Sequence, residues 1–246
     1  MPERYLLVWC SHQTLPDYQK EMLAAFDSGE GAWEIVSLSD PELAEKAVAF
    51  DGFVISGSEK SALQTDQPWH ATLSALIRHA WVEKKPLVGI CFGAQMVAKS
   101  MGGEVSSNPS GRFMLGGETI ELLEPLGSWC AEAGFNRRPR VLESHGECIS
   151  MLPPGAELLA RSETAAVEVF SLGTAMLGIQ GHPEMSLRTM NEVVLPLHLS
   201  DGNLSAADAV DARRSLERET TVEGLLALCR SLLADGTLPR MRKVTS

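Results

Sequence analysis

Short apolar runs alternate with longer segments of mixed polarity through the first part of the chain. The apolar runs lie between residues 5 and 90 and read YLLVWC, WEIVSL, GFVISG and PLVGI. The segments between them have helical spacing and cover Asp17–Phe26, Pro41–Phe50 and Pro68–Glu83. Continuous apolar runs are typical of parallel strands, because helices cover both faces of such a sheet. The pattern predicts repeated β-α units in an α/β fold with an open, mostly parallel sheet.

The middle of the chain has a different pattern. Between residues 113 and 182, β-rich stretches follow one another closely, separated by Gly or Pro: FMLGGETIELL, RVLESHGECI, AELLAR, AAVEVFSLG and AMLGIQGH. This close spacing predicts antiparallel strands that extend the sheet or form a small side sheet.

From Met185 onward the pattern is helical again. Ser205–Arg218 is charged enough for a solvated helix, and Val222–Leu233 has the apolar content of a packed one. We expect residues 1–200 to form the main domain and residues 201–246 a C-terminal helical extension.

Composition narrows the class of partner. A chain of 246 residues with 44% hydrophobic content is long enough to bury one sizeable core. The formal net charge is −11 and the Lys and Arg residues are scattered, so no basic face is expected and nucleic acid is disfavoured as a partner. No apolar stretch reaches the length of a membrane span. The expected partner is a small-molecule substrate, with neither nucleic acid nor membrane involved.

The cysteines indicate a reducing compartment. There are five, an odd number, with neither a C-x-x-C spacing nor a Cys/His metal pattern. We therefore expect free thiols, a cytoplasmic location, and no metal or cofactor.

One cysteine stands apart from the others. Cys91 follows the apolar run Leu87–Ile90 and lies between Gly89 and Gly93 in the stretch GICFG, ahead of a helical segment. A strand that runs into a Gly-flanked residue and then a helix is typical of a nucleophile elbow. A thiol at a helix start also feels the helix dipole, which favours the thiolate. Cys91 is the predicted nucleophile.

A cysteine nucleophile needs a base and a group that orients the base. In GIQGHPE, His182 precedes Pro183, which favours an extended backbone, so that Glu184 should flank the imidazole. His145 in ESHGE is the rival base, but it lacks such a carboxylate two residues on. His182 is favoured as base and Glu184 as its orienting partner. The remaining histidines have no partner pattern in the sequence: His12, His70, His79 and His198.

A tetrahedral intermediate formed by thiolate attack needs backbone donors near its oxygen. The amide of Phe92, directly after the nucleophile, is one candidate. The other is Gly57 in VISGSEKSA, where a glycine lets the backbone approach a ligand.

With these motifs assembled, the chain resembles the class I, triad-type glutamine amidotransferase family over approximately Arg4–Leu197. The resemblance implies a flavodoxin-like catalytic domain within residues 1–200, with a small antiparallel extension. It also implies that Gln95 binds the amino acid portion of the substrate. Ser58 and the SHGE segment, with Ser144, His145 and Gly146, are implied beside the substrate.

Within that family, the chain looks most like stand-alone GMP-synthase-like members, which include the plant γ-glutamyl peptidases. Two features depart from the family pattern. Ala94 stands where many members have His, and Gly57-Ser58-Glu59 replaces a Gly-Gly-Pro-like loop. Neither removes a predicted triad residue.

Three classes of function fit these motifs. The first is a hydrolase that cleaves the γ-glutamyl amide of glutamine or γ-glutamyl peptides through a γ-glutamyl thioester. The second is a glutaminase subunit that delivers ammonia to a separate synthase chain. The third is a non-catalytic binding module on the same fold. An unrelated cysteine peptidase would share the elbow but take its base elsewhere, with His145 as the candidate.

Overall fold

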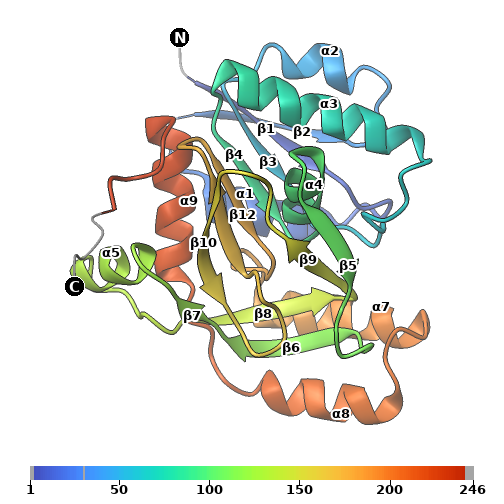
Figure 1. Ribbon diagram of the computed structural model, residues 1–246. Helices are drawn as coiled ribbons and strands as arrows, with labels where there is room; N and C mark the ends of the chain where they lie inside the picture. The colour runs from blue at the N-terminus through green and yellow to red at the C-terminus, as the bar shows by residue number, and fades with distance from the viewer. Residues whose placement is uncertain (1–2, 30, 242–246) are drawn as a thin grey trace.

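A single eight-stranded sheet organises the computed structural model, which describes residues 3–29 and 31–241 (Figure 1). The strand order is β2-β1-β3-β4-β12-β11-β10-β7. The first five strands in this order are parallel. Four of them are the apolar runs of the first ninety residues: β1 (Arg4–Trp9), β2 (Ala32–Ser37), β3 (Gly52–Ile55) and β4 (Leu87–Ile90). The fifth is β12 (Met176–Ile179), which pairs with β4.

The remaining strands are antiparallel, and they form both of the arrangements that the sequence allowed. The main sheet is extended by β11 (Val169–Leu172), β10 (Ala156–Arg161) and the short β7 (Glu121–Leu122). Two side ladders pair β5 (Glu104–Ser107) with β9 (Glu147–Met151), and β6 (Met114–Thr119) with β8 (Arg140–His145).

Helices cover both faces of the sheet (Figure 1). One face packs against α2 (Leu43–Ala47), α3 (Pro68–Glu83) and α4 (Phe92–Ser100). The other packs against α1 (Pro16–Phe26), α5 (Leu126–Glu132) and α9 (Glu223–Asp235). These two layers bury the central strands completely, as the continuous apolar runs predict.

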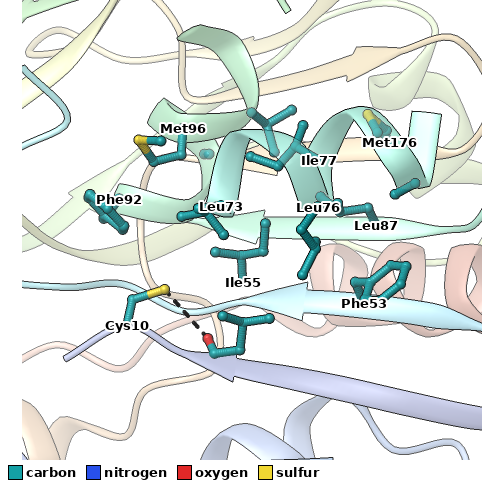
Figure 2. Packing of buried hydrophobic residues seen from close by; sticks show 14 of the residues in the cluster. Cys10, Phe53, Ile55, Leu73, Leu76, Ile77, Leu87, Phe92, Met96 and Met176 are labelled. Atoms are coloured by element: carbon teal, nitrogen blue, oxygen red, sulfur yellow. Dashed lines mark hydrogen bonds between the residues drawn. The ribbon is translucent and has the colours of Figure 1, made fainter. Parts of the chain in front are cut away.

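Alternate residues of each buried strand enter opposite cores, because side chains of a strand alternate between its faces. Phe53 and Ile55 of β3 join the cluster under α3 and α4, whereas Val54 between them joins the cluster under α1 and α9. Figure 2 shows the first of these clusters, with Ile55 of the sheet facing Leu73 of α3.

A third hydrophobic cluster lies away from the main sheet. It joins β6 and β8 to the chain that follows β12, namely α6 (Leu187–Thr189), the π-helical turn Met190–Val194, α7 (Leu195–Ser200) and α8 (Ala206–Ser215). Ser205 begins α8 with a capping box, in which its hydroxyl accepts from the Asp208 amide. This cluster holds the chain after residue 185 against one edge of the site described below.

The fold class predicted from the sequence is confirmed, with local differences. The predicted helix at Pro41–Phe50 is shorter, since α2 covers only Leu43–Ala47. The division at residue 200 stays a prediction, and α9 shares a core with the central strands. No helix within residues 3–29 and 31–241 is long and apolar enough to cross a membrane.

Candidate active site

Cys91 lies at the sharp turn between β4 and α4, with a strained backbone of φ 50° and ψ −107°. Small neighbours permit this turn. A Cβ on Gly89 would lie 2.7 Å from the Gly93 carbonyl, and a Cβ on Gly93 would lie 2.3 Å from the Ile55 carbonyl oxygen. Positive φ in a residue other than glycine is costly and is concentrated at functional sites. The glycines of GICFG therefore let the strand, turn and helix pack closely enough to aim the Cys91 thiol into the site.

His182 and Glu184 follow β12, the strand beside β4 in the sheet. The His182 amide donates to the Leu142 carbonyl at 2.7 Å, which fixes the extended backbone expected before Pro183. The imidazole Nδ1 lies 2.9 Å from Glu184 Oε1, and both side chains are buried. With Nδ1 protonated toward the carboxylate, the other ring nitrogen is free to face the thiol.

The charges around His182 favour its protonated form. Burial by itself lowers the pKa of His182, but the Glu184 carboxylate and hydrogen bonding with Cys91 outweigh it, and the pKa lies well above its ordinary value. An imidazolium beside a thiol stabilises the thiolate, the nucleophilic form. The arrangement can therefore hold a thiolate-imidazolium pair.

Gly57 brings backbone close to the Cys91–His182 pair. A Cβ at Gly57 would lie 2.8 Å from His182 Cε1 and 3.6 Å from Cys91 Cβ, so a larger residue has no room here. Phe92 occupies the first position of α4, where helix N–H groups lack partners within the helix. Both predicted oxyanion donors thus lie next to the Cys91 side chain.

Tyr18 of α1 was not singled out from the sequence. Its hydroxyl donates to Glu184 Oε1 at 2.5 Å and lies 3.3 Å from His182 Nδ1. Burial, together with the nearby Glu184 charge, raises the pKa of Tyr18 well above its usual value. Tyr18 therefore stays neutral and shares one carboxylate oxygen with His182. No local pattern in LPDYQKEM marks this residue, because its partners are more than 160 residues away along the chain.

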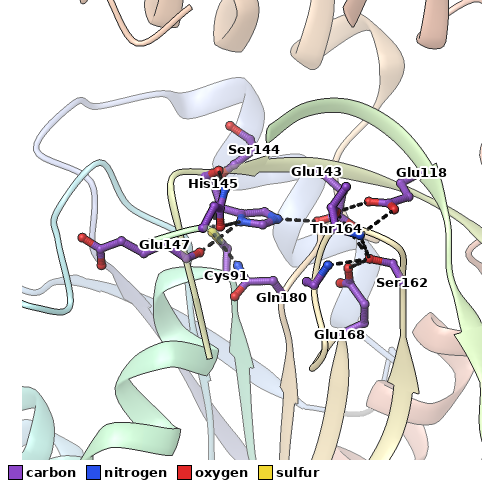
Figure 3. A network of polar contacts seen from close by, with 12 residues as sticks. Cys91, Glu118, Glu143, Ser144, His145, Glu147, Ser162, Thr164, Glu168 and Gln180 are labelled. Carbon is purple, nitrogen blue, oxygen red and sulfur yellow. Dashed lines mark hydrogen bonds and ion pairs between the residues drawn. The ribbon is translucent and has the colours of Figure 1, made fainter. Parts of the chain in front are cut away.

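Gln95 is buried one helical turn after Cys91. Its amide donates to the Glu147 carbonyl at 2.8 Å and to Gln180 Oε1 at 3.2 Å. The sequence did not predict a role for Gln180 either. Its side-chain amide nitrogen donates to Cys91 Sγ at 3.7 Å. These two side chains connect the nucleophile to the start of β9. Figure 3 shows Gln180 beside Cys91.

A cavity of about 320 Å³ opens above Cys91 and His182. The other residues expected beside a substrate, Ser58, Ser144, His145 and Gly146, all line it. Ser144 carries its carbonyl oxygen 3.6 Å from Cys91 Sγ, and Ser58 donates to the Cys10 carbonyl at 3.0 Å. The volume is at the lower end of the range for small-molecule sites.

The family model for class-I glutamine amidotransferases matches residues 20–200, more than half of the chain. The protein belongs to the class-I glutamine amidotransferase family. The matched range includes the elbow, the GHPE segment and every other residue predicted for the site.

Two kinds of relative show what the chain is similar to. Gamma-glutamyl peptidase 4 of Arabidopsis thaliana is 32% identical over 197 residues, covering 78% of this chain and 76% of its own. A glutamine-hydrolyzing GMP synthase subunit of Thermococcus kodakarensis is 38% identical over 114 residues, which cover 46% of this chain and 58% of that protein. A crystal structure of glutamine amido transferase from Methylobacillus Flagellatus superposes with a TM-score of 0.71 at 25% identity, covering 100% of this chain and 98% of the other.

The rival base, His145, is buried, and its ring nitrogens have partners other than the thiol. Its Nδ1 lies 3.1 Å from Asn108 Oδ1 and 3.0 Å from the Glu147 carbonyl, so this nitrogen carries the proton. Its Nε2 lies 3.5 Å from Glu143 Oε2 (Figure 3). Burial raises the pKa of Glu143 to about 8 and lowers the pKa of His145. Both groups are therefore neutral near pH 7, and neither nitrogen of His145 is directed at Cys91.

The departures from the family pattern lie beside the site. Ala94 is fully buried in α4. Glu59 lines the cavity and accepts from the His12 amide at 2.8 Å. Although burial opposes ionisation, backbone and side-chain hydrogen bonds lower the pKa of Glu59 to about 2. The loop after β3 therefore carries a fixed negative charge where the family pattern has a neutral residue.

The other cysteines are buried in the protein core. Burial raises the pKa of Cys10 to about 12 and of Cys130 to about 11, and it also raises those of Cys148 and Cys229. Of the described cysteines, Cys91 lines the cavity.

Proposed function

We propose that the protein is a Cys-His-Glu hydrolase that cleaves the γ-glutamyl amide of glutamine or of γ-glutamyl peptides. The observation that carries the proposal is the strained turn at Cys91, which aims the thiol into a cavity beside an imidazole held by Glu184. Membership of a family whose relatives include peptidases and glutamine-hydrolysing subunits supports it.

In the proposed reaction, His182 holds the thiol proton and Cys91 attacks the γ-carbonyl carbon. A C–S bond forms, and the amides of Gly57 and Phe92 donate to the oxyanion. His182 then protonates the departing amine as the C–N bond breaks, which leaves a γ-glutamyl thioester. His182 next takes a proton from water, which attacks the thioester and releases glutamate and the thiol. Glu184 orients His182 throughout.

The glutamyl half needs charged and polar contacts because it carries an α-amino and an α-carboxylate group. We assign these contacts to Gln95, Ser58 and the backbone of Ser144, His145 and Gly146, on the polar side of the cavity. His145 contributes through its main chain, since its ring is engaged by Asn108 and Glu143.

A glutaminase subunit is the second candidate. Similarity to the GMP synthase subunit of Thermococcus kodakarensis favours it, because that protein's name describes a glutamine-hydrolysing subunit. Here the departing group would be ammonia, passed to a synthase chain that this protein would have to bind.

The test is to incubate the purified protein separately with glutamine and with glutathione and to measure ammonia, glutamate and cysteinylglycine. We expect Cys91→Ser to lower the rate of glutamate release at least about a thousandfold. Cys130→Ala, which removes a buried thiol in α5, should retain activity.

The products separate the two candidates. Release of cysteinylglycine that depends on Cys91 identifies a γ-glutamyl peptidase that acts alone, and ammonia from glutamine alone identifies a glutaminase. Turnover that survives in Cys91→Ser, or a Cys91 thiol that iodoacetamide does not alkylate near pH 7, would contradict the proposed hydrolase.

A further inference from the structure

The loop after β3 (residues 56–67) carries two of the residues assigned to the reaction. Gly57 is a proposed oxyanion donor and Ser58 a proposed substrate contact, and both line the cavity. Residues 56–67 lie in neither a helix nor a strand. The position of the Gly57 amide relative to Cys91 therefore depends on the contacts that this loop makes with neighbouring elements.

The first half of the loop is held by the end of β1. The Cys10 amide donates to Ser56 Oγ at 2.8 Å. The Cys10 carbonyl accepts from the Ser58 hydroxyl at 3.0 Å and from Lys60 Nζ at 2.6 Å. These contacts fix residues 56–60 on the β1 side of Gly57.

The second half of the loop is held by the side chain of Glu147. The Ala62 amide donates to Glu147 Oε2 at 3.0 Å, and the Ser61 hydroxyl donates to Glu147 Oε1. The Ala62 carbonyl accepts from Lys99 Nζ of α4 at 2.8 Å, and Ala62 is fully buried. Hydrogen bonds with a charged partner are stronger than those between neutral groups. Both oxygens of one carboxylate are thus engaged by the loop after β3.

Glu147 itself is fixed by its main chain. It begins β9 and pairs with Ser107 of β5. Its carbonyl accepts from the Gln95 side-chain amide at 2.8 Å and lies 3.0 Å from His145 Nδ1. Figure 3 shows its side chain extending away from Cys91. Glu147 therefore joins the loop after β3 to the two segments that carry Gln95 and His145.

We propose that Glu147 is a positioning residue, whose carboxylate holds the loop after β3 so that the Gly57 amide stays where the oxyanion forms. This inference rests on the proposed hydrolase function and adds a residue to its machinery. An oxyanion donor acts only when it lies about 3 Å from the developing charge. A displacement of about 1 Å can lower the rate about a hundredfold.

The test is steady-state kinetics of Glu147→Ala with glutamine and with glutathione. We expect kcat to fall at least about tenfold and KM to change less than about threefold, because an oxyanion donor acts in the transition state. Alkylation of Cys91 by iodoacetamide should change less than about twofold, since that reaction forms no oxyanion. Glu104→Ala is the matched control, because Glu104 is exposed at the far end of the same β5–β9 ladder. It should change neither rate.

Two further variants separate positioning from a direct contact with substrate. Glu147→Gln should retain most of kcat, because its amide oxygen can accept from the Ala62 amide and its amide nitrogen can donate to the Ser61 hydroxyl. Ser61→Ala should lower kcat less than Glu147→Ala does, and adding it to Glu147→Ala should cause no further loss. A raised KM that is equal in Glu147→Gln and Glu147→Ala would overturn the positioning role, because it would show that the charge binds substrate. Additive losses with Ser61→Ala would overturn it too.

Hydrogen exchange of the loop gives a readout independent of turnover. Peptides that cover residues 53–66 should exchange at least about tenfold faster in Glu147→Ala than in the wild type, because the loop loses its contacts with β9. Unchanged exchange would overturn the proposal, and so would a parallel fall in Cys91 alkylation, which would show that the whole site is disturbed. Absence of hydrolysis in the wild type contradicts the proposed function instead, and the exchange measurement still decides whether Glu147 holds the loop.

Discussion

Tyr18 and His182 compete for one oxygen of Glu184. Both lie within hydrogen-bond distance of Oε1, at 2.5 Å from the Tyr18 hydroxyl and 2.9 Å from His182 Nδ1. A hydrogen bond to a carboxylate withdraws part of the charge that would otherwise stabilise a neighbouring cation. The Tyr18 hydroxyl therefore moderates how strongly Glu184 holds the His182 proton, and we infer that it is a positioning residue for the triad.

Tyr18→Phe should raise the pKa of His182 further. Turnover needs the imidazolium to protonate the departing amine, so loss of its proton sets the alkaline limit of kcat/KM, and this limit is expected to move to higher pH. The measurement is kcat/KM against pH, whose maximum we also expect to fall a few-fold. Tyr5→Phe is the matched control, because Tyr5 is the other tyrosine of the chain and its hydroxyl donates to the Leu233 carbonyl at 3.1 Å. An unchanged pH profile in Tyr18→Phe would refute the positioning role.

At the scale of elements, the site depends on how closely α4 approaches the sheet. Gly89 and Gly93 occupy the contact points of the strand-turn-helix unit, and a Cβ on Gly93 would meet the β3 backbone at 2.3 Å. The π-helical turn Met190–Val194 and α7 bring Val194 and His198 to the cavity. The turn before α4 therefore directs the Cys91 thiol, and the π-helical turn and α7 line the cavity that the thiol faces.

Gly93→Ala is expected to displace α4 and to lower the free energy of unfolding by about 1–3 kcal/mol, as overpacking does in a close-packed interior. Because Cys91 begins the same helix, its alkylation rate should fall as well. Gly155→Ala is the control for a lost glycine: its φ is 81°, but a Cβ there meets nothing within 4 Å. Urea unfolding and iodoacetamide kinetics on both variants should show lower stability in each and reduced alkylation in Gly93→Ala alone. Normal alkylation in Gly93→Ala would be evidence against this account of the turn.

For the molecule as a whole, a buried carboxyl group connects stability to pH. Glu143 is fully buried between the β6–β8 ladder and Gly181, and it faces the imidazole of His145. Its pKa is raised to about 8 by burial and by the nearby charge of Glu118. Between about pH 5 and 8 the folded protein therefore keeps a proton that the unfolded chain has lost, so this group makes the protein less stable as pH rises.

Glu143→Gln should remove this pH dependence, because an amide keeps the shape of the protonated carboxyl without titrating. The difference in unfolding free energy, variant minus wild type, should increase by up to about 1.4 kcal/mol per pH unit between pH 5 and 8. Above pH 8 the difference should become constant. Urea titrations at pH 5, 6, 7 and 8 measure this. Glu132→Gln, at the exposed end of α5, is the matched control for the same change of side chain. A constant difference in Glu143→Gln would mean that Glu143 is ionised throughout this range.

Local sequence determined the parallel sheet and the geometry around Cys91, His182 and Glu184. Continuous apolar runs are sufficient to indicate strands buried on both faces, and the glycines of GICFG and the His-Pro-Glu spacing act within a few residues of the groups they position. The resemblance to glutamine amidotransferases rests on the same short motifs, and the family match confirms it.

Tertiary structure alone decided what surrounds this chemistry. Tyr18 meets Glu184 across 166 residues, and His198 meets Ser144 across 54, and neither contact leaves a periodic or motif signal in the chain. The surroundings of His145, the rival base in the sequence, were likewise decided by packing, because its Nε2 faces Glu143 in a contact between buried side chains. Such contacts depend on how separate elements pack, and packing is fixed only when the whole core has formed.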